Sequence, residues 1–225
     1  TDYDMGTGTR NLRKSQNVPS GHDPAEYVTR RITATSHDGA EVPVSIVYHR
    51  DTPLDGSAPV LLYGYGAYGI TIPAGFSVTR LSLVTRGFIY AIAHIRGGKA
   101  LGHNWFMQGR GAKKPNSFKD FAAAARALIA RGWTTPGNIT IHGGSAGGLL
   151  VGATVNLAPE LFRAAIAEVP FVDVLTTMLD DTLPLTPPEW PEWGNPIESA
   201  TDYATIKAYA PYENIREIDY PHILA

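Results

Sequence analysis

Ser145 stands between glycines in the stretch IHGGSAGGLL (141–150) and is the residue of this sequence best placed to act as a nucleophile. Gly143 and Gly147 flank it in a G-x-S-x-G pattern, which is typical of a tight strand-to-helix turn that exposes a serine hydroxyl. Glycine at both positions avoids a collision inside the turn and tolerates a strained backbone. The helix predicted to begin at Ala146 directs its free N–H groups at the site. The Ala146 N–H is therefore the first expected donor to an oxyanion.

A second oxyanion donor is expected from the loop after an earlier strand, and LLYGYGAYG (61–69) occupies that place. This loop lacks the HGGG motif with which many lipases and esterases donate backbone N–H groups. A tyrosine phenol is a neutral hydrogen-bond donor that can serve instead. Tyr63, Tyr65 and Tyr68 are the candidates, and two of the three are expected to be packing aromatics.

A serine hydroxyl needs a base to take its proton, and α/β-hydrolases carry serine, acid and histidine in that chain order. His222 is the only histidine after Ser145, and it lies at the start of a predicted strand. His142 is expected to face the sheet interior or its packing helices. His94 ends a neighbouring strand near the active edge and is the best substitute. None of the three stands where the chain order requires the base.

Apolar runs without strict alternation predict strands buried on both faces of a parallel sheet. Helix-forming stretches lie between them, and strands that alternate with helices indicate an α/β fold. The predicted strands cover 59–66, 87–95, 138–144 and 164–170, and the predicted helices cover 117–132 and 146–158.

The first fifty residues carry a different pattern. Residues 1–16 predict a short polar hairpin, and 17–26 are rich in turn residues and predict a linker. An antiparallel hairpin is expected on either side of the Asp38-Gly39 turn, with Pro43 near a sheet edge.

Composition narrows the class of protein. The net charge is −2 and no basic stripe is present, which argues against nucleic-acid binding. The chain has no cysteine and no apolar run of about 20 residues, so thiolate chemistry and a membrane span are not expected. No metal-ligand spacing occurs, and neither a metal nor a cofactor is expected. Lys113, Lys114, Asp120 and Asp173 are expected to be solvated. A cytoplasmic location is expected, with the periplasm left open.

Four blocks of the sequence resemble the catalytic domain of the prolyl oligopeptidase family of serine peptidases: LLYGYGAYG, RGFIYAIAHIRGG, GGSAGG, and VPFVDVLTTMLD with the PLT and EWGNP that follow it. The last block is most similar to the oligopeptidase B branch. The resemblance implies an α/β-hydrolase domain over 27–225 that is truncated before its last strands. It also implies that 1–16 are the end of a β-propeller blade, with 17–26 as the linker. The expected partners are short peptide substrates and the N-terminal β-propeller of the same protein.

The resemblance also assigns roles to individual residues. Ser145 matches the family nucleophile, Tyr65 matches the side-chain oxyanion donor, and Ala146 supplies the backbone N–H. Glu189 matches an acid that receives a basic P1 residue in the oligopeptidase B branch, and Phe171 resembles an aromatic wall of that pocket. The alternatives are a solvated acid for Glu189 and an ordinary core position for Phe171.

Two departures from the family pattern matter for specificity. The loop ITIPAGF (70–76) has Pro73 and Gly75 where some branch members carry acids, which argues against a strong preference for a basic P2 residue. GGSAGG has alanine where prolyl-specific relatives often have asparagine, which favours the oligopeptidase B side.

The sequence therefore predicts a serine oligopeptidase that cleaves short peptides after Arg or Lys through an acyl-enzyme. The resemblance implies that the triad Asp and His both fall beyond Ala225, so the 225-residue chain is expected to be nearly inactive alone. The alternatives are a prolyl-specific oligopeptidase, an esterase, and a non-catalytic binding fragment.

Overall fold

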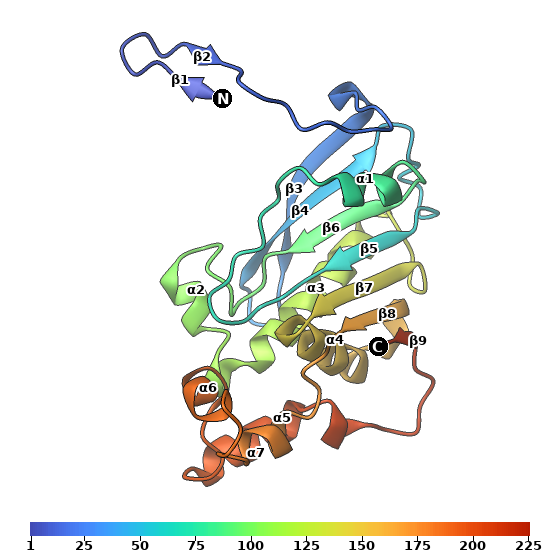
Figure 1. The fold of residues 1–225 in the computed structure, drawn as a ribbon. Helices are drawn as coiled ribbons and strands as arrows, with labels where there is room; N and C mark the ends of the chain where they lie inside the picture. The colour runs from blue at the N-terminus through green and yellow to red at the C-terminus, as the bar shows by residue number, and fades with distance from the viewer.

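The computed structural model describes all residues 1–225, and its centre is a seven-stranded sheet (Figure 1). The strand order is β3-β4-β6-β5-β7-β8-β9. Neighbours from β6 to β9 run parallel, whereas β3, β4 and β6 pair antiparallel. The strand bounds are β3 Tyr27–Thr35, β4 Glu41–His49, β5 Val60–Tyr63, β6 Ile89–Ala93, β7 Ile139–Gly144, β8 Phe162–Glu168 and β9 His222–Leu224.

The apolar runs of the sequence form the central strands of the sheet, where other parts of the chain cover both faces. Successive residues of β5 alternate between the faces: Val60 and Leu62 join the large core cluster, and Leu61 joins a small cluster on the opposite face. The four predicted strands and the two predicted helices are confirmed, with ends that differ by a few residues.

The predicted hairpin around Asp38-Gly39 is confirmed as β3 and β4, with Ile32 opposite Val44. The expected place of Pro43 is wrong, because the edge strand is β3 and β4 is paired on both sides. Pro43 is tolerated inside the sheet because its carbonyl accepts the His94 N–H at 2.9 Å, a bond that needs no N–H from the proline.

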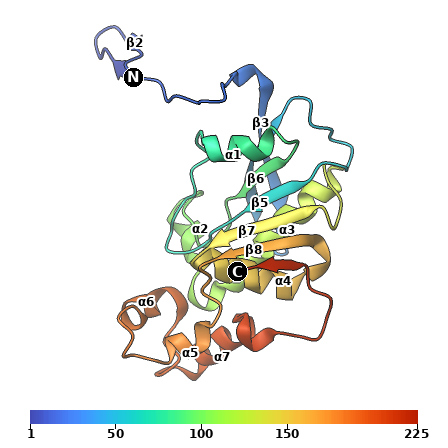
Figure 2. The same cartoon turned by 45° about the vertical axis from the view of Figure 1, so that its right-hand side comes forward.

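Helices cover the two faces unequally (Figure 2). The long helices α3 (Pro115–Ala130) and α4 (Ala146–Leu157) pack against one face and bury the main core. The short α1 (Val78–Val84) contributes Val84 to the small cluster on the other face. Most of the buried core therefore lies on the α3 and α4 side of the sheet.

Neither α1 nor four further helices were predicted from the sequence. The four are α2 (His103–Met107), α5 (Val174–Met178), α6 (Thr186–Trp193) and α7 (Ala200–Tyr209). Figure 1 shows α5, α6 and α7 together below the sheet, near the ends to which the β7 and β8 arrows point. Single 3-10 turns cover Pro24–Glu26, Gly111–Lys113, Pro159–Leu161 and Tyr212–Asn214.

The N-terminal residues form the expected hairpin, with β1 (Asp2–Tyr3) antiparallel to β2 (Arg10–Asn11). Its residues are exposed, and it extends away from the sheet (Figure 1). None of the helices is long and apolar enough to cross a bilayer.

Candidate active site

Ser145 occupies the bend between β7 and α4, with its side chain exposed and φ at +56°. This left-handed conformation costs a residue with a side chain about 1–3 kcal/mol, and it persists only where the surroundings hold it. The backbone N–H and carbonyl of Ser145 are hydrogen-bonded to the end of β8 and to the segment that follows it. Its N–H donates to the Glu168 carbonyl at 2.9 Å, and its carbonyl accepts the Phe171 N–H at 3.1 Å.

The glycines around Ser145 are required by close backbone contacts. A Cβ on Gly143 would lie 2.2 Å from the Gly147 carbonyl oxygen, and one on Gly147 would lie 2.9 Å from the Gly64 carbonyl oxygen. Neither neighbour is a flexible side chain that could move away. The G-x-S-x-G pattern therefore builds the bend, as the sequence predicted.

Tyr65 follows β5 and lies beside this bend: a Cβ on Gly147 would be 3.3 Å from Tyr65 Cδ2. Burial raises the pKa of the Tyr65 phenol, and the nearby Ser145 hydroxyl opposes that rise only in part. The phenol therefore keeps its proton at neutral pH and can donate it. Of the three candidate tyrosines, the structure brings Tyr65 to the serine hydroxyl.

Ala146 is the first residue of α4 and is buried. N–H groups in the first turn of a helix have no intrahelical acceptor. Its N–H and the Tyr65 phenol are thus two neutral donors close to Ser145. Such a pair can stabilise the oxyanion of a tetrahedral intermediate.

A cavity of about 300 Å³ opens beside Ser145 and brings together the other two predicted residues. Phe171 forms part of its wall, and Glu189 lies within it although 44 positions (189 − 145) separate it from the serine in the chain. The remaining lining is mostly apolar and comes from the segment before and within α6: Thr177, Met178, Leu183, Pro184, Leu185 and Thr186, together with Tyr68 and Ala146.

Glu189 is a half-buried acid held in one orientation. Its Oε2 accepts hydrogen bonds from the Tyr68 phenol and from Trp193 Nε1, both at 2.9 Å. Burial and this bond to Glu189 raise the pKa of Tyr68, which remains a donor. The Phe171 ring packs on Trp193 with centroids 5.5 Å apart. An oriented carboxylate at one end of an apolar cavity fits a long cationic side chain.

No histidine is hydrogen-bonded to Ser145. His94 is buried, and its Nε2 lies 2.8 Å from Ser45 Oγ, so the best substitute from the sequence is engaged on β4. His142 does not face the sheet interior as expected. Its side chain is one quarter exposed, and its Nε2 lies 3.2 Å from Glu168 Oε2. The structure brings neither of them to the nucleophile.

Two charged residues expected in solvent are buried instead. Lys114 is 2% exposed, and its Nζ donates to the Gly66 carbonyl at 2.5 Å. Asp120 is fully buried and accepts two hydrogen bonds from the Arg96 guanidinium. The signal that could have found Lys114 is its spacing: it directly precedes α3 and lies four residues before the buried Phe118, in line with the helix face that packs into the core.

Glu192 was missed because its neighbours in the sequence, proline and tryptophan, gave no helical pattern. It is 5% exposed on α6, and its Oε1 accepts the Tyr68 N–H at 3.0 Å. Together, Lys114 and Glu192 contact the backbone of the loop that carries Tyr65 and Tyr68.

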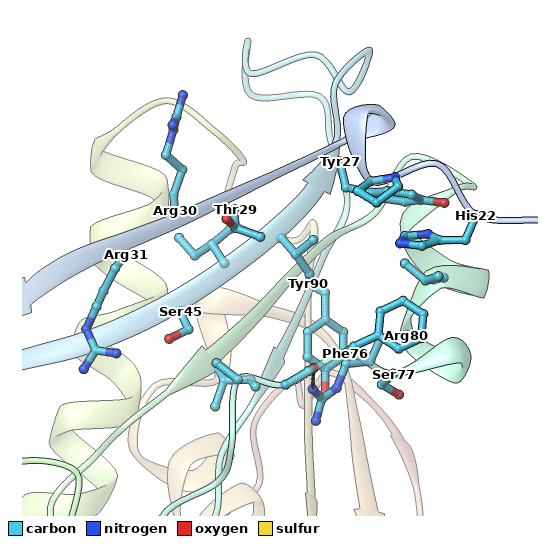
Figure 3. Close-up of a pocket in the computed structure, with 17 residues that line it drawn as sticks. His22, Tyr27, Thr29, Arg30, Arg31, Ser45, Phe76, Ser77, Arg80 and Tyr90 are labelled. Carbon is cyan, nitrogen blue, oxygen red and sulfur yellow. Dashed lines mark hydrogen bonds between the residues drawn. The ribbon is translucent and has the colours of Figure 1, made fainter. Parts of the chain in front are cut away.

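A second cavity, of about 630 Å³, lies on the other face of the sheet (Figure 3). Tyr27, Phe76, Arg80 and Tyr90 line it together with Ser45. None of the predicted site residues contributes to it. The chain contains no group of three side chains that could hold a metal ion.

The parallel sheet, the strained serine bend and the flanking helices define an α/β-hydrolase catalytic domain. A family model described as the prolyl oligopeptidase family matches residues 74–225. The chain belongs to the prolyl oligopeptidase family.

Individual relatives agree with this assignment. The chain is 46% identical over 224 residues to dipeptidyl aminopeptidase BI of Pseudoxanthomonas mexicana, which covers 98% of the chain and 31% of the relative. Among solved structures, oligopeptidase B from Leishmania major matches with a TM-score of 0.94 and 44% identity over 99% of this chain and 31% of that one. Oligopeptidase B from Trypanosoma brucei with covalently bound antipain gives 0.94 and 47%, over 98% and 31%. The chain thus spans about a third of the length of these relatives.

Proposed function

We propose that the whole protein is a serine oligopeptidase that cleaves short peptides after Arg or Lys through an acyl-enzyme on Ser145. The observation that carries the proposal is the shared cavity: the Ser145 hydroxyl and the Glu189 carboxylate lie on one space of about 300 Å³. A P1 residue whose side chain fills this space places the cationic end of that side chain at Glu189 and its own backbone carbonyl carbon at Ser145 Oγ.

The reaction follows from these positions. Ser145 Oγ attacks the carbonyl carbon while a base takes its proton, and the carbonyl oxygen becomes an oxyanion between the Tyr65 phenol and the Ala146 N–H. When the intermediate collapses, the base returns the proton to the leaving amine. Water then attacks the ester carbonyl by the same route and frees Ser145.

The base is not among the residues that contact Ser145. Since the relatives are about three times longer than the chain, we place the histidine and its acid outside these 225 residues. The 225-residue chain alone would then show at most weak residual activity, which comes from substrate binding and oxyanion stabilisation. Residues 1–16 would belong to a β-propeller of the same protein, linked by 17–26, and we expect the protein in the cytoplasm.

Prolyl specificity is the second candidate, and the aromatic rings around the cavity favour it. Tyr68 and Phe171 line the space where a proline ring would pack, and the Trp193 ring lies behind both. Glu189 argues against it, because a proline ring offers the carboxylate no hydrogen-bond donor and no charge. An esterase or a non-catalytic binding fragment would need Ser145 and Glu189 to share a cavity by coincidence.

The test compares Arg–X and Pro–X peptide amides as substrates of the whole protein, with Glu189→Gln as the variant. Gln keeps an oxygen for Tyr68 and Trp193 but loses the charge. Unpairing a buried charge costs about 2–5 kcal/mol, so kcat/KM for the Arg–X peptide should fall roughly 30-fold to several thousandfold. Glu198→Gln is the matched control, because Glu198 is an exposed acid shortly after α6, the helix that carries Glu189. It should leave kcat/KM unchanged for both peptides. Faster Pro–X than Arg–X cleavage, insensitive to Glu189→Gln, would favour the prolyl alternative.

A further inference from the structure

The loop that follows β5 serves the site at both of its ends. Tyr65 brings its phenol to Ser145, and Tyr68 donates to Glu189. Between them the backbone is left-handed twice, with φ at +77° for Gly66 and +55° for Tyr68. Glycine accepts this conformation freely, but tyrosine does not, so the loop needs external contacts to keep its shape.

Lys114 supplies one of these contacts from the start of α3. Its Nζ donates to the Gly66 carbonyl at 2.5 Å and lies 4.9 Å from the centroid of the Trp193 ring. The ammonium forms no direct ion pair, although it is 2% exposed. Burial lowers the pKa of Lys114 to about 8, and the charge of Glu192 opposes that shift only in part.

Glu192 supplies the second contact from α6. Its Oε1 accepts the Tyr68 N–H at 3.0 Å, two residues beyond the carbonyl that Lys114 holds. Burial raises the pKa of this carboxyl, while Lys114 and the Tyr68 N–H lower it. The same helix carries Glu189, so α6 touches both the loop and the cavity.

A buried ammonium without a carboxylate partner is costly, because its desolvation is not repaid by an ion pair. A leucine or methionine in the same place would pack against Trp193 without that cost. What an apolar residue could not do is hold the Gly66 carbonyl in a left-handed loop.

We propose that Lys114 and Glu192 are positioning residues for catalysis, which fix the Gly66 carbonyl and the Tyr68 N–H and thereby hold the Tyr65 phenol at the oxyanion position. This inference rests on the proposed peptidase function. Neither residue touches the substrate; both act through the loop.

The test is Lys114→Met in the whole protein, assayed with an Arg–X peptide amide. A displacement of about 1 Å in a positioned group can cost 10²-fold, so kcat should fall roughly 10- to 100-fold while KM changes by less than about threefold. Lys113→Met is the matched control. Lys113 is the exposed neighbour whose Nζ reaches only Gln108 Oε1, and its loss should leave kcat unchanged.

The second readout combines Lys114→Met with Tyr65→Phe. Removing one oxyanion donor costs about 10²- to 10³-fold in kcat by itself. If Lys114 acts through Tyr65, adding Lys114→Met to Tyr65→Phe should cost less than about threefold more. A role in general stability would instead give losses that multiply, together with a lowered Tm. Such multiplication, or a Lys114→Met enzyme with wild-type kcat, would overturn the inference.

Glu192→Gln provides a second variant in case Lys114→Met does not fold. Gln keeps an acceptor for the Tyr68 N–H but removes the charge that faces Lys114, so the expected loss in kcat is smaller than for Lys114→Met and again disappears in the Tyr65→Phe background. A Glu192→Gln loss that persists fully in that background would contradict the inference. The proposed function fails in a different way: the wild-type protein would then show no turnover that depends on Ser145, and the inference would fall with it.

Discussion

Arg96 and Lys114 are two buried cations close to the loop after β5, and their surroundings differ sharply. Arg96 is 3% exposed, and its guanidinium pairs with two carboxylates, those of Asp120 and Asp38. Lys114 is equally buried but meets one carbonyl and one indole ring. Burial by itself would lower the pKa of Arg96, yet its hydrogen bonds to Asp120 and Asp38 outweigh burial and raise it. Burial instead lowers the pKa of Lys114 to about 8.

The difference in pairing indicates different roles: Arg96 stabilises the fold, whereas Lys114 serves the candidate site. The Arg96 network ties the β3–β4 turn to α3 and to the loop after β6, with every charge answered. Such a network holds the elements of the fold together, and its charged groups are all paired with one another rather than available to a substrate. An incompletely paired buried cation that contacts a loop of the site is the kind of group found at functional sites.

Asp120→Asn should have the largest effect on stability. The Asp120 carboxylate accepts four hydrogen bonds, three from Arg96 and one from Ser36. Asp120→Asn would leave Arg96 with Asp38 as its one carboxylate partner, and breaking a buried pair on one side costs about 3–5 kcal/mol in the free energy of unfolding, measured by denaturant titration. The half-exposed Asp38 is the matched control: Asp38→Asn should cost less than about 1 kcal/mol. Equal costs would show that burial does not set the strength of this network.

Lys114→Met should affect stability in the opposite sense. Below pH 8 the folded protein must keep a charged ammonium out of water, so the variant should be as stable as wild type or more stable. The unfolded chain holds the lysine proton up to its ordinary value of 10.5, whereas the folded chain releases it from about pH 8. Between those values the unfolded state binds more protons, and wild-type stability should rise with pH relative to the variant.

The measurement is the difference in the free energy of unfolding between wild type and Lys114→Met at several pH values from 7 to 10.5. Lys113→Met serves as the control, because an exposed lysine should give a flat difference over the same range. If wild type is much the more stable protein at pH 7 and loses that advantage as pH rises, then Lys114 is a stabilising ion and the contrast with Arg96 disappears.

The sequence predicted the parts of the molecule in which local pattern decides structure. The apolar runs of β5 to β8 and the glycines around Ser145 carry their own geometric reasons, and the bend formed as expected. The structure of residues 171–214 was not predicted from the sequence. The helices α5, α6 and α7 in this segment are short, rich in proline or weakly amphipathic, and their positions are set by tertiary contacts.

The site was predicted only in part for the same reason. Ser145 and Ala146 follow from the motif, whereas Tyr65 and Glu189 were chosen by resemblance, since nothing local distinguishes them from Tyr63 or from other surface acids. Lys114 and Asp120 were expected in solvent because charged residues usually are. Their burial depends on partners far away in sequence, Gly66 and Arg96, that no local pattern reveals.

The most direct test of the account is to label the whole protein with a peptidyl phosphonate that carries Arg at P1 and to map the modified residue by mass spectrometry. A phosphonate reacts with an activated serine and leaves its anionic oxygen where the oxyanion would form. We predict one adduct, on Ser145, that is absent in Ser145→Ala and forms far more slowly in both Tyr65→Phe and Glu189→Gln. An adduct on another residue, or labelling of Ser145 at the same rate in all variants, would contradict the account.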